Sequence, residues 1–279
     1  FAGFRKTLDW VLRRRPEYLN ISHCLVLPGS DLWRQAREFG LVFQDDAPLS
    51  GRSEEFVPGS GIEVSAADPL LAETIRWTRS STRTFTGKPW RVLPRRRAQD
   101  VLAAREALAR IKRYWPREHR DILFFTRLLV PVDGNSQQAG TLKPMLGGVF
   151  FPFSPHWWVN MENLIHEAAH LRLSYHGLLG GFTRGDEGYV RSPWSRVPRR
   201  PSIVLQAGYI YLLAAEGLLR ALDSGDRFVR EPLIRRAERL LAGYPGYWKL
   251  AGRIPLTPLG ESLVEACRRR HAALAGRRP

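Results

Sequence analysis

The chain has 279 residues, of which 44% are hydrophobic and 25% are charged. This composition is ordinary for a globular protein and excludes the disordered and fibrous classes, and the length allows one large domain or two small ones. No apolar run comes near the roughly 20 residues that cross a bilayer, so we expect no membrane-spanning segment.

The balance of charge is strongly basic, with 43 Lys and Arg residues against 27 Asp and Glu residues. Arginine supplies 38 of the basic residues, and they are spread along the chain without a motif that reads nucleic acid. The pattern argues against nucleic acid as a partner. It favours an acidic peptide or a small carboxylate.

The two cysteines, Cys24 and Cys267, are far apart in the sequence and have no C-x-x-C spacing. This excludes a disulfide scaffold and a cysteine-built zinc site, and it favours a reducing, cytoplasmic location. We expect both thiols to be buried as small apolar groups.

The spacing of apolar residues predicts few elements in the first 90 residues and a series of them afterwards. We expect helices over 4–15, 66–78 and 96–114, strands over 122–132 and 147–153, and helices over 157–175, 202–222, 227–241 and 258–274. A loop with three prolines and many arginines occupies 183–201. Strands followed by helices indicate an α+β fold with a helix-dominated C-terminal half.

The motif His166-Glu167-Ala168-Ala169-His170 lies inside the predicted helix 157–175. Residues four apart fall on one face of a helix, so both imidazoles can reach a single metal ion. Glu167 is adjacent and can contact a metal-bound water. The alternative is that two core histidines accompany an exposed glutamate, but the spacing favours a metal site. We expect this helix to pack on a small sheet.

Two histidines leave a metal coordination sphere incomplete, so a third ligand must come from elsewhere. Glu216 is the only acidic residue in the predicted helix 202–222 and is the candidate. Two histidines and one carboxylate suit a zinc peptidase and a non-haem iron enzyme equally well, so the spacing leaves Zn(II) and Fe(II) both open.

The order of motifs around this helix resembles the HExxH-type peptide β-hydroxylases, the α-ketoglutarate-dependent iron enzymes of ribosomal peptide natural-product pathways. The resemblance covers roughly 120–265. Its motifs are the glycine-containing strand 147–153, the helix with His166 and His170, the Pro193-Trp194 loop, the helix 202–222, and the segment Leu256-Thr257-Pro258-Leu259-Gly260. Here Val197 stands where relatives usually carry an aspartate.

The resemblance implies a cofactor set and a reaction. His166 and His170 would hold Fe(II), which binds α-ketoglutarate, and the enzyme would hydroxylate the β-carbon of a residue in a precursor peptide. Arg199 matches the family's arginine, with Arg196 and Arg200 beside it, and an arginine fork suits the far carboxylate of α-ketoglutarate.

The family's third ligand is less well matched. Many relatives carry a histidine in the opening turns of the second helix, where this chain has Gln206, Tyr209 and Tyr211. Gln206 or Glu216 would take that position.

Two other functions remain open. In a zinc metallopeptidase Glu167 would act as the general base on a zinc-bound water. In a non-catalytic relative the basic surface would only bind a peptide. For the domain organisation we expect an N-terminal segment over 1–90 and a metal-binding catalytic domain over 91–279, or one continuous domain. Oligomeric state is not predicted.

Overall fold

A computed structural model gives the fold. It describes residues 56–57, 62–64, 91–92, 98–133, 139–141, 147–177, 180–195, 198–223 and 229–276. All of these belong to one unit, Arg52–Pro279. The helices predicted at 4–15 and 66–78, and Cys24, lie outside the described residues.

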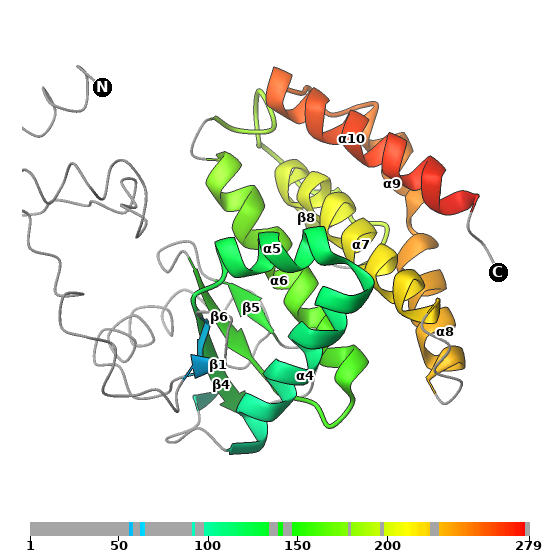
Figure 1. Ribbon diagram of the computed structural model, residues 1–279. Coiled ribbons are helices and arrows are strands. Elements are labelled where there is room, and N and C mark those ends of the chain that lie inside the picture. The colour runs from blue at the N-terminus through cyan, green and yellow to red at the C-terminus, as the bar shows by residue number, and fades with distance from the viewer. Residues whose placement is uncertain are drawn as a thin grey trace, which may run out of the picture. The chain divides into compact units, whose positions relative to one another are not determined.

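A small mixed sheet forms one side of this unit (Figure 1). Its strands are β1 (Phe56–Val57), β2 (Ile62–Val64), β3 (Arg91–Val92), β4 (Leu128–Asp133), β5 (Gly140–Thr141) and β6 (Gly148–Phe151). The order is β1-β2-β4-β6-β5, and β3 pairs with β4. The β2–β4 and β4–β6 pairs are parallel and the others antiparallel. Two of these strands, β1 and β2, come from the first 90 residues and join the same sheet as β4.

Helices make up most of the described chain. They are α4 (Ala98–Tyr114), α5 (Pro116–Phe125), α6 (Trp157–Gly177), α7 (Pro201–Leu222), α8 (Arg230–Leu241), α9 (Tyr244–Ala251) and α10 (Pro258–Ala275). The helix-dominated architecture with a small mixed sheet agrees with the expected α+β class. The helices predicted at 96–114, 157–175, 202–222, 227–241 and 258–274 are confirmed as α4, α6, α7, α8 and α10, apart from 96–97 and 227–228, which lie outside the described residues.

The prediction of one strand over 122–132 is partly wrong, because its first residues belong to α5. Pro116 opens that helix at a first-turn position, where its missing N–H costs nothing. Ile122 is on the buried face of the helix, and β4 begins only at Leu128. The apolar residues at the end of α5 are thus followed almost at once by those of β4, and the sequence shows them as one apolar run.

The central helices are α6 and α7 (Figure 1), and α7 lies against α6, α8, α9 and α10. Two glycines allow this close packing. A Cβ on Gly208 would lie 2.3 Å from the Tyr247 ring, and one on Gly217 would lie 2.4 Å from Ile165 Cδ1. Within the described residues, α7 is also the one helix long and apolar enough to cross a membrane, contrary to the expectation of no such run. Most of that stretch is buried in the protein, as in the core helix of a soluble fold.

The loop between α6 and α7 carries a short hairpin, β7 (Val190–Arg191) paired with β8 (Pro198–Arg199). The first part of this loop is hydrogen-bonded to the segment that begins α10. Thr257 donates a hydrogen bond from its hydroxyl to the Gly181 carbonyl (2.6 Å), and the same oxygen accepts one from the Gly260 amide (3.1 Å). Leu256 forms an isolated β-bridge with Thr183. The Leu256–Gly260 segment therefore joins α10 to the loop that follows α6.

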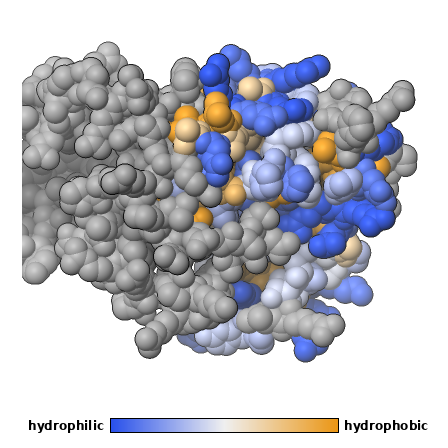
Figure 2. Space-filling view, turned by 90° about the horizontal axis from the view of Figure 1, so that it is seen from below, coloured by the Kyte–Doolittle hydropathy of each residue, from blue (hydrophilic) through white to orange (hydrophobic). Residues whose placement is uncertain are grey.

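The described surface is mainly hydrophilic on the face that Figure 2 shows. Figure 2 shows one face on which blue, hydrophilic residues predominate and orange, hydrophobic residues are scattered between them. Cys267 is fully buried on α10, which confirms the expectation for that thiol.

Candidate metal site

The start of α6 is fixed by a reciprocal pair of hydrogen bonds at the turn after β6. The Ser154 amide donates to Asn160 Oδ1, and Asn160 Nδ2 donates to the Ser154 carbonyl, both at 2.8 Å. The Asn160 side chain is almost wholly buried. This local lock sets where the first turns of α6 begin, and therefore where its later residues point.

His166 and His170 lie side by side on α6, with 5.0 Å between their ring centroids. Metal–nitrogen bonds of about 2 Å require the two rings of a shared site to be near neighbours, as these are. Both are half-buried, and 24% of the His166 side chain is exposed. Burial lowers the pKa of His170 to about 4 and, together with the charges of His170 and Arg236, lowers the pKa of His166 well below its usual value. Both imidazoles are therefore neutral at pH 7, the state that binds metal ions.

Glu167 interacts with the side chain and backbone of Thr141 on β5. Its Oε1 also lies 3.9 Å from His166 Nε2. Its Oε2 is buried and has no hydrogen-bond partner in the part of the chain that the structure describes. Burial raises the pKa of this carboxyl to about 8, against the lowering effect of Thr141. A buried carboxyl oxygen without a hydrogen-bond partner is costly, and a bound cation or its water would satisfy it.

Aromatic rings form a wall beside the histidines. Tyr211 of α7 lies 5.6 Å from the His166 ring, centroid to centroid, and Trp194 lies 5.0 Å from Tyr211. Trp194 is held in turn, because its indole N–H donates to the Leu240 carbonyl at 2.7 Å. The Pro193-Trp194 loop thus contributes to the surroundings of the two histidines.

Arginines approach the same region from two elements. Arg199 of β8 and Arg236 of α8 both act electrostatically on the Tyr211 hydroxyl, whose pKa burial raises and their charges lower. Arg236 also forms a bidentate ion pair with the buried Glu162, one turn before His166 on α6, with contacts of 2.7 to 3.0 Å. Arg200 is exposed at the N-cap of α7, and Arg196 lies outside the described residues.

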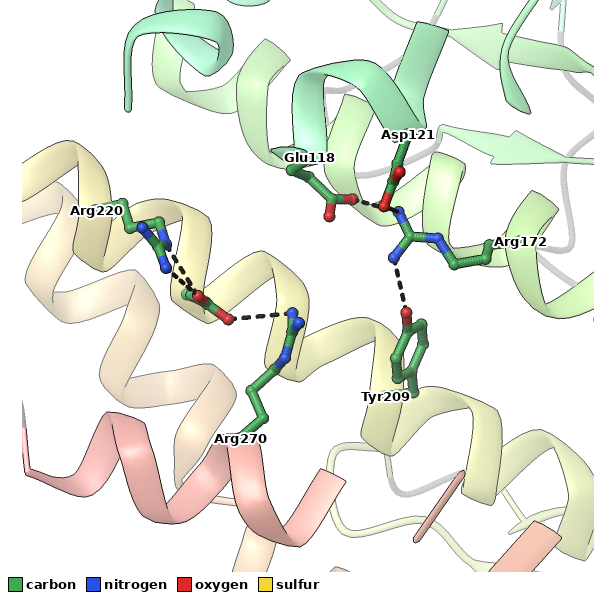
Figure 3. A network of polar contacts seen from close by, with 7 residues as sticks. Glu118, Asp121, Arg172, Tyr209, Arg220 and Arg270 are labelled. Atoms are coloured by element: carbon green, nitrogen blue, oxygen red, sulfur yellow. Dashed lines mark hydrogen bonds and ion pairs between the residues drawn. The ribbon is translucent and has the colours of Figure 1, made fainter. Parts of the chain in front are cut away.

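Glu216 is not brought to the histidines. Its carboxylate forms ion pairs with Arg220 (2.7 Å) and Arg270 (3.1 Å), and dashed lines from these two labelled arginines lead to it in Figure 3. Five positions at 100° per residue put it about 140° around α7 from Tyr211, which does reach His166. The structure therefore places the predicted third ligand among arginines.

Gln206 is also five positions from Tyr211, so it points about 140° away from that residue around α7, on the side nearer Tyr209. The Tyr209 hydroxyl accepts a hydrogen bond from Arg172 (2.8 Å), which also pairs with Glu118 and Asp121 (Figure 3). Neither candidate from α7 thus joins the two histidines. Within the described residues, no group of three or more His, Cys, Asp and Glu side chains is placed to hold one ion.

Three residues beside the histidines were not among the predicted site residues. They are Tyr211, Glu162 and Arg236. The i, i+4 spacing of Glu162 and His166 was a usable signal, since it puts both on one face of α6. Arg236 had no local signal, because a tertiary contact between α6 and α8 brings it there.

Comparison of the chain with protein-family models and with curated proteins finds no match. The geometry and chemistry of the site are therefore the basis for its function.

Proposed function

We propose that this protein is a metal-dependent enzyme that modifies peptides, specifically an Fe(II)/α-ketoglutarate-dependent hydroxylase acting on the β-carbon of a residue in a ribosomally made precursor peptide. The observation that carries the metal site is the neighbouring pair of His166 and His170 on α6. The buried, unpartnered Glu167 Oε2 beside them supports it, because this oxygen needs a donor or a cation.

The residues present fit a metal ion in part. His166 and His170 would hold it through neutral imidazoles, and exchangeable ligands would occupy other positions. Fe(II) with α-ketoglutarate and O2 would supply the oxidation that replaces a C–H bond by C–OH, with release of succinate and carbon dioxide.

The chain's own residues have three tasks in this proposal. Arg199 and Arg236 provide positive charge next to Tyr211 for the far carboxylate of α-ketoglutarate, and a guanidinium fork matches that group. Glu162 holds Arg236 in place. Tyr211 and Trp194 cover one side of the histidines with rings and exclude water from it.

A zinc metallopeptidase is the second candidate, and one observation favours it. Glu167 Oε1 lies 3.9 Å from His166 Nε2, so a carboxylate is next to the position of any ion that His166 binds. A bound cation would favour the ionised form of this carboxyl, which could then accept a proton from a metal-bound water. A non-catalytic, peptide-binding role is the third candidate, and it requires that the histidines bind no ion.

Metal binding separates the third candidate from the other two. The full chain is stripped with a chelator, incubated anaerobically with Fe(II) or with Zn(II), desalted, and assayed for metal by mass spectrometry. We expect about one ion per chain, lost in His166→Ala and in His170→Ala. His176→Ala is the matched control, because His176 is an exposed histidine at the end of the same helix. A wild-type chain that retains no ion of either kind contradicts the enzyme proposal.

Two activity measurements separate the enzymes. With Fe(II), α-ketoglutarate and O2, the hydroxylase yields succinate and a peptide heavier by one oxygen atom. With Zn(II), the peptidase yields cleaved peptide, and Glu167→Gln abolishes the cleavage. Calorimetric titration of the Fe(II)-loaded chain with α-ketoglutarate gives a readout without turnover, and we expect Arg199→Ala to weaken that binding about ten-fold. Cleavage without hydroxylation would replace the first proposal by the second.

A further inference from the structure

A cavity lies between α5, α7 and α10, on the side of α7 that bears Glu216. Its volume is about 550 Å³, within the range of small-molecule sites. It is lined by Arg117, Tyr209, Glu216, Arg220, Ala266, Arg269, Arg270, Ala273 and Leu274. Four guanidinium groups thus surround one carboxylate, and the cavity carries an excess of positive charge.

Two of the arginines are held in position. Glu216 is 7% exposed and pairs with both Arg220 and Arg270. The guanidinium groups of these arginines also lie 4.9 Å and 5.5 Å from the centroid of the Trp115 ring. A carboxylate and an indole therefore fix the direction of both forks before any ligand arrives, which lowers the entropic cost of binding.

One donor and one acceptor in the cluster of Glu216, Arg220 and Arg270 make no hydrogen bond within the described residues. Arg270 Nη1 and Glu216 Oε2 lie 3.1 Å apart, close enough for an ion pair. Both atoms are buried, and neither makes a hydrogen bond within the described residues. The donor on Arg270 thus remains available to an acceptor that meets it with better geometry.

The other two arginines of the cavity, Arg117 and Arg269, make weaker contacts with the rest of the described protein. Arg117 is exposed on the first turn of α5, and no carboxylate in the described residues pairs with it. Arg269 pairs at 3.3 Å with Glu265, but both side chains are more than half exposed, so that pair is weak. Both guanidinium groups are free to turn toward an anion in the cavity.

We propose that this cavity binds a small anionic ligand through a phosphate or carboxylate group, independently of the histidine site. Arg270 and Arg220 receive the anionic group, and Arg117 and Arg269 close over it from the rim. Ala266, Ala273 and Leu274 contact an apolar part of the ligand. An arginine guanidinium can pair with two oxygens of a phosphate or of a carboxylate. The expected ligand is therefore an oxyanion attached to an apolar group.

The test measures anion binding to the chelator-treated full chain at constant ionic strength, with chloride as the reference anion. Inorganic phosphate, phenylphosphonate and benzoate are titrated by calorimetry. The last two share a phenyl body and differ in the anionic group, so they distinguish a phosphate ligand from a carboxylate ligand. We expect saturable, millimolar or tighter binding of at least one of them. We expect phenylphosphonate to bind more tightly than inorganic phosphate.

Variants with opposite expected effects locate the binding. Arg117→Gln combined with Arg269→Gln should raise the dissociation constant about ten-fold. Glu216→Gln removes the one negative charge but keeps an amide oxygen that can still accept a hydrogen bond from Arg220, and it should lower the dissociation constant several-fold. The matched control, Arg105→Gln combined with Arg239→Gln, removes the same charge from exposed positions on α4 and α8 and should leave it within about two-fold.

Two results would overturn the proposal. One is that the wild-type chain shows no saturable binding of any of the three anions. The other is that the Arg117/Arg269 and Arg105/Arg239 double variants weaken binding equally, which would mean that the anions respond to overall charge. Because both double variants alter exposed side chains, this comparison stands even if Glu216→Gln fails to fold.

Discussion

Tyr211 on α7 packs its ring beside the imidazole of His166 on α6, with 5.6 Å between the two centroids. This contact ties the metal-site proposal to the packing of the two central helices, because the ring limits the directions that the imidazole can take. Groups that orient a metal ligand typically contribute about 10- to 100-fold to metal affinity.

The first prediction follows from that contact. Tyr211→Ala should weaken metal binding about ten-fold or more, because His166 loses the ring that orients it. Tyr211→Phe keeps the ring and should bind metal nearly as well as the wild type. Competition with a coloured chelator gives the affinities. Tyr209→Phe, on the other side of α7, is the control, and an equal effect in that variant would contradict the orienting role.

The second prediction concerns the pair of Glu162 and Arg236. Glu162 is 5% exposed, so Arg236→Met leaves a buried carboxylate without its partner. We expect the free energy of unfolding to fall by about 2–3 kcal/mol. Glu162→Met in the Arg236→Met background should recover most of this loss. Urea denaturation measures both, and a double variant as unstable as the single one would show that packing, rather than the unpaired charge, causes the loss.

The third prediction concerns Gly260 at the first turn of α10. A Cβ at this position would lie 1.9 Å from the Phe182 carbonyl oxygen, a backbone atom that cannot turn aside. Gly260→Ala should therefore lower the free energy of unfolding by about 3 kcal/mol. Gly252→Ala is the control, since its Cβ would meet only ordinary contacts of 3.5 Å and more. Thermal unfolding compares the two, and similar midpoints would contradict the close approach.

The fourth prediction concerns the Cys267 thiol. It is fully buried, and burial raises its pKa to about 12. At pH 8 almost no thiolate exists in the folded protein, so Cys267 should resist iodoacetamide until urea is added. Since the folded state holds this proton more tightly than the unfolded state, the thiol's contribution to stability is full below pH 8 and decreases as the pH rises from about 9 to 12. Peptide mapping after alkylation measures the reactivity, and rapid labelling of Cys267 in the native chain would refute the burial.

The sequence predicted the long helices well because α4, α6, α7, α8 and α10 have periodic apolar positions and clear ends. It failed at 122–132, where a helix end and a strand follow each other within one apolar run. It also missed α9, whose eight residues are too few for a periodic pattern to stand out.

In the candidate site, too, the positions set by one helix could be predicted and those set by tertiary packing could not. The neighbouring positions of His166 and His170 follow from one helix and could be predicted from spacing alone. Glu216 could not be placed correctly from the sequence, because nothing local distinguishes the face of α7 toward α6 from the face toward α10. Arg270 provides the counter-charge for Glu216, and it comes from a helix 54 positions later in the chain.

The fastening of α10 to the loop after α6 has a consequence for the histidine site. Thr257 and Gly260 fix one end of the loop that carries Trp194, and the ring of His271 stacks on Tyr244, which packs against Trp194. The indole is thus braced from α10 through side chains that touch neither histidine. Deleting α10 would leave His166 and His170 in the chain but take away the support behind their aromatic neighbour.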